Sequence, residues 1–149
     1  MRHISRQLYT SSRGTKCCTF FGLYHELGGR LEFVNGDHSP PLVLSNGGVR
    51  FLESTGVPLG LFPEVSHKTG RAILEPGTLV VMYSEGLTEA RNPEGEIYGV
   101  DRLVQFVSRA AHQETAGLVD KILADVGSFS ANAPVEDDRT LLLLKVDPA

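Results

Sequence analysis

The sequence predicts an α+β fold built on antiparallel sheet, and three features of its pattern lead to this prediction. Short segments rich in β-formers, separated by turns containing Gly and Pro, fill the first half of the 149-residue chain. After Gly99 the apolar residues recur at the spacing of a helix. An apolar segment at residues 140–146 is typical of a buried terminal strand. Grouped strands that precede helices favour α+β over an alternating α/β arrangement.

Turn signals separate the expected strands. The sequences LGG at 27–29, SNGG at 45–48 and EPG at 75–77 contain the residues that tight turns require. Because SNGG lies between two short apolar segments, it predicts a β-hairpin. The expected strands are residues 17–26, 30–34, 42–44, 49–52, 66–74, 78–83 and 140–146.

Two amphipathic helices are expected between the last two strands. The first presents an apolar face of Leu103, Phe106, Val107 and Ala110. The second is predicted to begin at Thr115, which has the side chain of an N-cap residue. Its apolar face consists of Leu118, Val119, Ile122, Leu123, Val126 and Phe129.

Residues 1–16 are expected to form a separate N-terminal segment. They are polar and basic, and they predict either a weak helix near residues 4–9 or disorder. From residue 17 onwards there is no repeat, low-complexity stretch or linker, so residues 17–149 are predicted to belong to one partial domain.

Composition excludes several classes of partner. The net charge of −4 argues against nucleic acid or an anionic membrane as the main partner. No apolar stretch approaches the roughly 18 residues that a membrane span needs, and the N-terminus lacks the apolar region of a signal peptide. Cys17 and Cys18 are adjacent, so their side chains would diverge on a strand and no disulfide between them is expected. Two free strand thiols fit a reducing cytoplasm, which is the expected location.

Two acidic clusters each adjoin an apolar strand. Glu85 follows the strand at 78–83, and Asp137 and Asp138 precede the strand at 140–146. If these strands are antiparallel neighbours, the carboxylates meet at one end of the sheet, where a cation would relieve their repulsion. Carboxylate oxygens suit Mg²⁺ or Mn²⁺, and Gly86 would let the backbone turn sharply. On pattern alone, two solvated turns explain the same residues and are favoured.

Four segments in order resemble a known family. These are FVNGDHSPPLVL (33–44), GVPLGLFPE (56–64), LEPGTLVVMYSEGLTEARNPEGEIYGVDRL (74–103) and DDRTLLLLKV (137–146). Together they make the chain similar to the C-terminal part of a metal-dependent protein phosphatase domain, of the PPM or type 2C-like kind. The branch is the bacterial one named for stage II sporulation protein E and related stress-response regulators. The resemblance implies an incomplete two-layer antiparallel β-sandwich flanked by helices.

The resemblance also implies roles for particular residues. Glu85 and Asp137 match the positions of metal ligands, and the expected cofactor is Mn²⁺ or Mg²⁺. The implied reaction is hydrolysis of phosphoserine or phosphothreonine by a metal-activated water, with no protein nucleophile. The implied partner is a small phosphorylated protein of the anti-anti-sigma type. Gly86, Asp138, Asn35 and His38 are expected to line or support the site.

The roles of three residues have open alternatives. Asp138 either orients metal-bound waters or caps its loop. His38 either touches the rim of the site or structures the loop that contains it. Arg91 either holds a phosphate or pairs with Glu89 or Glu94.

Two departures from the family pattern leave the activity open. The family's upstream Asp-x-Ser-Gly-His-Gly motif has no counterpart here, and Glu85 stands where the family has Asp. The chain is therefore expected to be either a protein-serine/threonine phosphatase or an inactive pseudophosphatase that serves as a binding module. Because the family's upstream helices have no counterpart, one sheet face is expected to be exposed. Self-association, or coverage by residues 1–16, would then protect that face.

Overall fold

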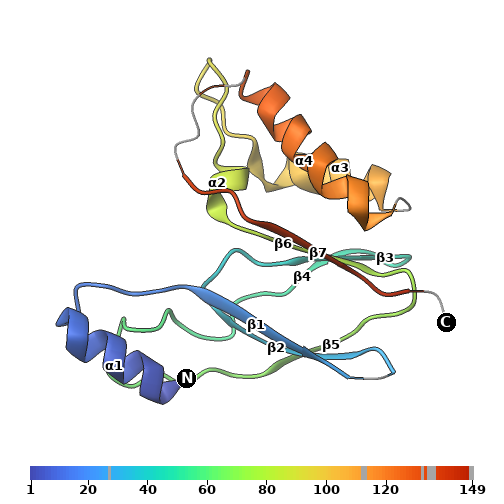
Figure 1. Cartoon of the computed structure of the whole chain (residues 1–149). Coiled ribbons are helices and arrows are strands. Elements are labelled where there is room, and N and C mark those ends of the chain that lie inside the picture. The colour runs from blue at the N-terminus through green and yellow to red at the C-terminus, as the bar shows by residue number, and fades with distance from the viewer. Residues whose placement is uncertain (27, 112–113, 132, 134–136, 148–149) are drawn as a thin grey trace. The chain divides into compact units, whose positions relative to one another are not determined.

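The computed structural model describes residues 1–26, 28–111, 114–131, 133 and 137–147, which fall into two compact units (Figure 1). The first unit contains Met1–Pro40 and Leu52–Leu74, and the second contains Pro41–Phe51 and Glu75–Ala149. Because each unit combines segments that are distant in sequence, neither boundary coincides with a break in composition. The predicted division of the chain at residue 16 stays a prediction.

The first unit contains a three-stranded antiparallel sheet in the order β1-β2-β5. These strands are Phe20–His25, Arg30–Gly36 and Gly70–Ile73. Alternation along the strands buries Leu31, Phe33 and Ala72 on one face. The opposite face exposes 62% of Tyr24 and 68% of Ile73, with the ion pair between Glu32 and Arg71 beside them.

Helix α1 of the same unit spans Arg2–Ser12 and is longer than the helix expected near residues 4–9. Buried Ser5 fixes it to a loop, because its hydroxyl donates to the Phe62 carbonyl at 2.9 Å and accepts from the Gly60 amide at 3.0 Å. Helix α1 therefore packs on the loop at residues 60–62, and Tyr24 and Ile73 of the sheet stay exposed. Coverage of the exposed face by residues 1–16 is therefore not what the structure shows, and self-association remains the expectation.

We predict that the exposed face makes the chain self-associate. Light scattering at increasing protein concentration should show a rising mean mass, and the double variant Tyr24→Ser/Ile73→Ser should reduce that rise because it removes apolar surface. Ile97→Ser, which changes an exposed apolar residue of the second unit, is the control and should behave as the unaltered chain does. A monodisperse monomer at every concentration contradicts the prediction.

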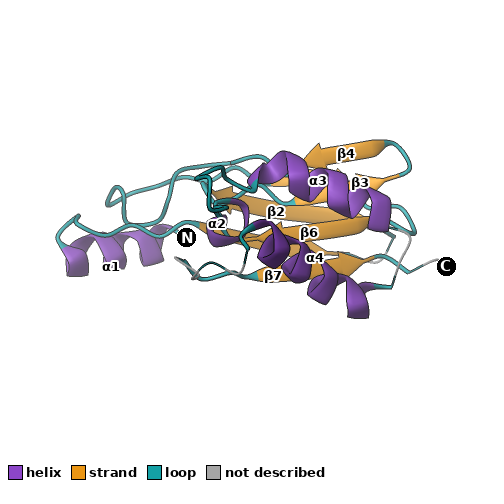
Figure 2. Cartoon of the chain, turned by 90° about the horizontal axis from the view of Figure 1, so that it is seen from above, coloured by secondary structure: helices purple, strands orange, loops and turns teal. Residues whose placement is uncertain are grey.

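The second unit contains a four-stranded antiparallel sheet in the order β4-β3-β6-β7. Its strands are Leu42–Ser45, Gly48–Phe51, Leu79–Tyr83 and Leu141–Lys145 for β3, β4, β6 and β7. Helices α3 (Gly99–Ala110) and α4 (Thr115–Phe129) lie on one face of this sheet (Figures 1 and 2). The buried cluster between them includes Leu42, Leu79, Val81, Leu103, Val107, Leu118, Ile122 and Val126.

Several expected boundaries are wrong, each for a local reason. Residues 17–19 lie outside β1 because Cys18 exchanges backbone hydrogen bonds with Leu59 of a loop, at 2.8 and 2.9 Å. Strand β5 is confined to Gly70–Ile73, and Lys68 bonds instead to the Thr55 carbonyl. The N-cap of α4 is Glu114 rather than Thr115, and no side chain caps that helix end.

Two further expectations concern membrane-spanning helices and the cysteines. Within the described part of the chain, no helix combines the length and the apolar character needed to cross a bilayer. Cys17 and Cys18 are both free and exposed, and they lie before β1 rather than on a strand.

Candidate functional site

The candidate site lies where β6 ends and β7 begins. The two strands are antiparallel neighbours with Tyr83 opposite Leu141, which confirms the pairing that the acidic clusters required. Beyond the strands the contact continues through Ser84. Its amide donates to the Thr140 carbonyl at 3.0 Å, and its hydroxyl donates to the Asp138 carbonyl and accepts from the Thr140 amide, both at 2.9 Å. The segments that carry the carboxylates are therefore held together by hydrogen bonds.

Gly86 is buried against the backbone that precedes β7. A Cβ atom at this position would lie 2.6 Å from the Asp138 carbonyl oxygen and 2.9 Å from that of Asp137. Such distances are far below van der Waals contact, so only glycine fits here. The backbone at Gly86 is helical rather than sharply turned, and the group that approaches it is the backbone of Asp137 and Asp138.

Glu85 begins a short helix, α2 (Glu85–Thr88), that the sequence did not predict. Both Glu85 and Asp137 are exposed, and one Asp137 carboxylate oxygen accepts the Asp138 amide at 2.8 Å. Among the described residues, no group of three or more His, Cys, Asp or Glu side chains is placed to hold a metal. Two exposed carboxylates fit one hard divalent cation that keeps several waters, because Mg²⁺ commonly binds through one or two carboxylates. Metal binding at these residues stays a prediction.

Asn35 and His38 belong to the first unit, whereas Glu85, Gly86, Asp137 and Asp138 belong to the second. The Asn35 side chain is fully buried. Its amide nitrogen donates to the carbonyls of Leu52 and His38 at 3.0 and 3.1 Å, and its oxygen accepts the His38 amide at 2.8 Å. Asn35 therefore ties its loop together. His38 is half-buried, with Nδ1 3.4 Å from the Thr19 hydroxyl. A role for either residue in lining the site stays a prediction.

A pocket of about 390 Å³ adjoins Asp137, and the sequence did not reveal it. Its wall includes Gly86, Glu89, Arg91, Asn92, Asp137 and Arg139. Arg91 was expected to hold a phosphate or to pair with a neighbouring glutamate. Within the described part of the chain it forms no ion pair, and its Nη1 donates to the Gly95 carbonyl at 3.0 Å. The turn ARNPEG at residues 90–95 supplies one wall of the pocket.

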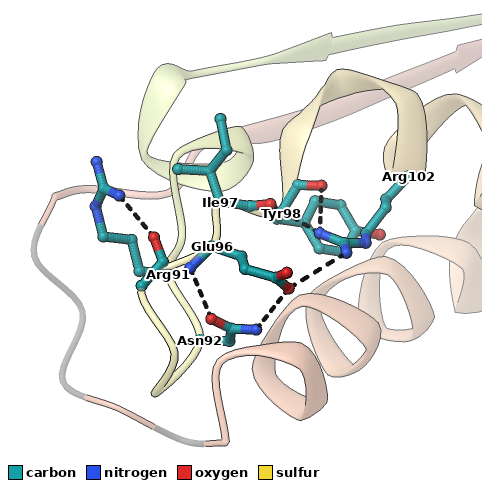
Figure 3. Close-up of polar contacts among 7 residues, drawn as sticks. Arg91, Asn92, Glu96, Ile97, Tyr98 and Arg102 are labelled. Atoms are coloured by element: carbon teal, nitrogen blue, oxygen red, sulfur yellow. Dashed lines mark hydrogen bonds and ion pairs between the residues drawn. The ribbon is translucent and has the colours of Figure 1, made fainter.

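Polar contacts hold that turn in shape (Figure 3). The Asn92 side chain accepts the Glu96 amide at 2.8 Å and donates to the Glu96 carboxylate at 3.0 Å. That carboxylate lies 3.8 Å from Arg102, whose Nη1 donates to the Ile97 carbonyl at 2.8 Å. Figure 3 shows Arg91 directed away from the Asn92–Glu96 contact. These contacts therefore hold the turn in shape, and the Arg91 side chain takes no part in them.

Tyr98 anchors the end of the turn to α4. Its hydroxyl donates to the Asp125 carboxylate at 2.6 Å, and its ring meets Phe129 edge-on with centroids 5.5 Å apart. Burial first, and then this hydrogen bond, raise the pKa of Tyr98 above its ordinary value. The Arg102 guanidinium lies 4.3 Å from the centre of the Phe129 ring. Contacts of Tyr98 and Arg102 with α4 thus fix the position of the turn at residues 91–97.

Solved structures share this architecture. The phosphatase domain of the cell fate determinant SpoIIE from Bacillus subtilis, presoaked with Mn, superposes with a TM-score of 0.63 at 16% identity, covering 87% of this chain and 56% of that one. The RsbU and RsbW domains of Rv1364c from Mycobacterium tuberculosis give a TM-score of 0.66 at 23% identity, covering 97% and 40% of the two chains. The antiparallel sheets and helices are therefore those of a PP2C-type phosphatase fold.

The sequence carries the assignment further. The model of the family described as stage II sporulation protein E (SpoIIE) matches residues 1–147, and the chain belongs to this family. Protein IcfG of Synechocystis sp. strain PCC 6803 is 32% identical over 90 residues, which make up 60% of this chain and 14% of that protein. Phosphoserine phosphatase RsbU of Bacillus subtilis is 25% identical over 130 residues, or 85% and 38% of the two chains. The chain thus spans well under half of these curated relatives.

Proposed function

We propose that the chain takes part in metal-dependent hydrolysis of phosphoserine or phosphothreonine on a bacterial regulatory protein. The observation that carries the proposal is the close contact between the Glu85–Gly86 turn and the Asp137–Asp138 backbone at one end of the sheet. Membership of the SpoIIE family and the relative named phosphoserine phosphatase RsbU support it. The free thiols of Cys17 and Cys18 are compatible with a cytoplasmic location, which is part of the proposal.

The chain's own residues would serve the reaction in distinct ways. Glu85 and Asp137 would hold Mn²⁺ or Mg²⁺, and Asp138 would orient waters bound to it. Gly86 keeps the two acidic segments in contact because no side chain separates them. When bound, such a metal supplies an acidified water and a positive charge for the phosphoryl oxygens. The proposed substrate is a phosphorylated protein of the anti-anti-sigma type, which the similarity to the RsbU and RsbW domains of Rv1364c supports.

An inactive pseudophosphatase that binds a partner protein is the second candidate. This candidate is favoured because Glu85 and Asp137 are only two carboxylates, and the described residues contain no group of three or more side chains that could hold a metal. The longer side chain of Glu85 adds to this, since Mg²⁺ demands near-ideal octahedral geometry.

Calorimetric titration with Mn²⁺ tests the metal site first. We expect millimolar or tighter binding that is lost in Glu85→Ala and in Asp137→Ala, because each variant removes one of two carboxylate ligands. Glu94→Ala removes a charge from the exposed turn near the pocket and should bind Mn²⁺ as the unaltered chain does. Absence of binding, or binding that survives both ligand variants, contradicts the proposed site.

Hydrolysis of a phosphoserine peptide with Mn²⁺ then separates the two candidates. Release of phosphate that stops in Glu85→Ala supports the phosphatase. Metal binding without release supports the pseudophosphatase.

A further inference from the structure

The pocket beside Asp137 is lined by two arginines, and each has hydrogen-bond donors that no described residue uses. Arg139 donates from Nε to the Gly86 carbonyl at 3.2 Å, and Arg91 donates from Nη1 to the Gly95 carbonyl at 3.0 Å. A guanidinium group has five N–H donors in a planar fork. Each side chain is therefore positioned by one backbone contact and keeps donors for a further partner.

Like Arg2, Arg13 and Arg109, these two arginines have no anionic partner among the described residues. Arg6, Arg30, Arg71 and Arg102 form ion pairs with glutamates, whereas Arg91 and Arg139 form none among the described residues. Arg139 is half-buried, so its charge is only partly solvated. An ion pair or a bidentate hydrogen bond with an oxyanion is the contact that such a group favours most.

The location, size and charged lining of the pocket also bear on the binding of an oxyanion. Gly86 and Asp137 contribute to its wall, so the pocket lies beside one of the two proposed metal ligands and beside the residue that follows the other. Its volume of about 390 Å³ exceeds that of a single phosphate and leaves room for neighbouring parts of a peptide. Glu89 and Asp137 offset the charges of the two arginines, so an anion would be held by direct contact with a guanidinium group and not by a net charge of the pocket.

We propose that the pocket bounded by Gly86, Arg91, Asn92, Asp137 and Arg139 binds an oxyanion of the phosphorylated substrate protein, with Arg91 and Arg139 as its donors. This proposal rests on the proposed function, because it takes the substrate to be a phosphoprotein. The oxyanion is either the phosphoryl group or the carboxylate of an acidic residue beside it, since both accept a bidentate guanidinium bond. Arg139 links the two sites because it holds the carbonyl of Gly86 in the turn that carries Glu85.

Fluorescence anisotropy with a short labelled phosphoserine peptide, flanked by glutamates, tests the proposal by binding alone. The peptide is titrated with the full chain, once with EDTA and once with Mn²⁺. Arg91→Gln and Arg139→Gln should each weaken binding about tenfold, the loss expected for one hydrogen bond to a charged group. Arg109→Gln makes the same change at an exposed position at the end of α3 and should leave binding unchanged.

Two further peptides identify which oxyanion is bound. If the phosphoryl group occupies the pocket, the arginine variants should bind a phosphoserine peptide with glutamine flanks about tenfold more weakly than the unaltered chain does. If a flanking carboxylate occupies the pocket, the same loss of affinity should instead be seen with an unphosphorylated peptide that has glutamate flanks. Arg139→Lys keeps the charge but not the fork and should bind with intermediate affinity.

Separate outcomes overturn this inference and the proposed function. If Arg91→Gln and Arg139→Gln bind each peptide as tightly as the unaltered chain does, the proposed oxyanion pocket is wrong, even if phosphate is released. Loss of binding in the arginine variants without any phosphate release overturns the phosphatase and keeps the pocket. Because Arg91 is exposed, Arg91→Gln is expected to fold and decides the test if Arg139→Gln does not.

Discussion

Replacement of Gly86 by alanine should lower the free energy of unfolding by about 3 kcal/mol, the upper part of the range for overpacking a tight site. The added methyl group would lie 2.6 Å from the carbonyl oxygen of Asp138, and this neighbour is backbone, which cannot rotate away. The turn and the segment before β7 would have to separate. Urea denaturation monitored by circular dichroism measures the loss.

Gly117→Ala is the matched control for this prediction. Gly117 lies within α4, and a Cβ atom there meets nothing within 4 Å. Alanine should stabilise that helix by about 0.5–1 kcal/mol, because glycine in a helix is less favourable. If Gly86→Ala is as stable as the unaltered chain, the 137–138 backbone does not lie against the turn.

Gly86→Ala should also weaken Mn²⁺ binding, even though it leaves both proposed ligands in place. The reason is geometric, since separation of the two segments moves Glu85 away from Asp137. Calorimetry on the folded variant, well below its unfolding midpoint, distinguishes this loss from unfolding. Unaltered Mn²⁺ affinity would mean that one segment alone holds the ion.

Comparison of sequence and structure shows why some features of the site were predictable. The strand at 79–83 and the strand at 141–145 are distant in sequence, and no pattern reveals that they pair. Their pairing could only be assumed, and the register with Tyr83 opposite Leu141 confirms it. Once the pairing holds, the antiparallel arrangement alone brings the two acidic segments to one end of the sheet.

Other features left no readable signal. Helix α2 has four residues, which is about one turn and too short to show a hydrophobic period. The pocket depends on the fold of the 91–97 turn and on Arg139, which are joined only in three dimensions. Thr115 has the right side chain for an N-cap, yet it is the first helical residue of α4, and the N-cap position is occupied by Glu114 in an extended conformation. Local residue preference is a weak guide where neighbouring positions can serve equally well.

Asn35→Asp should destabilise the first unit by about 3 kcal/mol at pH 7, although the two side chains have nearly the same shape. Asn35 is fully buried, and its amide nitrogen donates to the carbonyls of Leu52 and His38. An ionised carboxylate would place an oxygen against those two carbonyl oxygens, so two hydrogen bonds would be replaced by repulsion. Asn46→Asp, in the exposed turn between β3 and β4, is the control and should change stability by less than about 0.5 kcal/mol.

The cost of Asn35→Asp should shrink as the pH falls. Burial beside carbonyl oxygens raises the pKa of the introduced carboxyl in the folded chain, so that the folded state binds a proton at a pH where the unfolded state does not. Stability relative to the unaltered chain should therefore improve from pH 7 towards pH 5, because the neutral acid can donate one of the lost bonds. Denaturation at both pH values measures this difference, and an unchanging difference would mean that the carboxyl reaches solvent.

The same variant separates the two roles considered for Asn35. If the residue only ties its loop together, Asn35→Asp at low denaturant and low temperature should bind the phosphoserine peptide as tightly as the unaltered chain, since the hydrogen bonds of Asn35 all go to its own unit. If Asn35 lines the site, the added negative charge should weaken binding of an anionic peptide in the folded protein. Its buried side chain and three backbone contacts favour the first outcome.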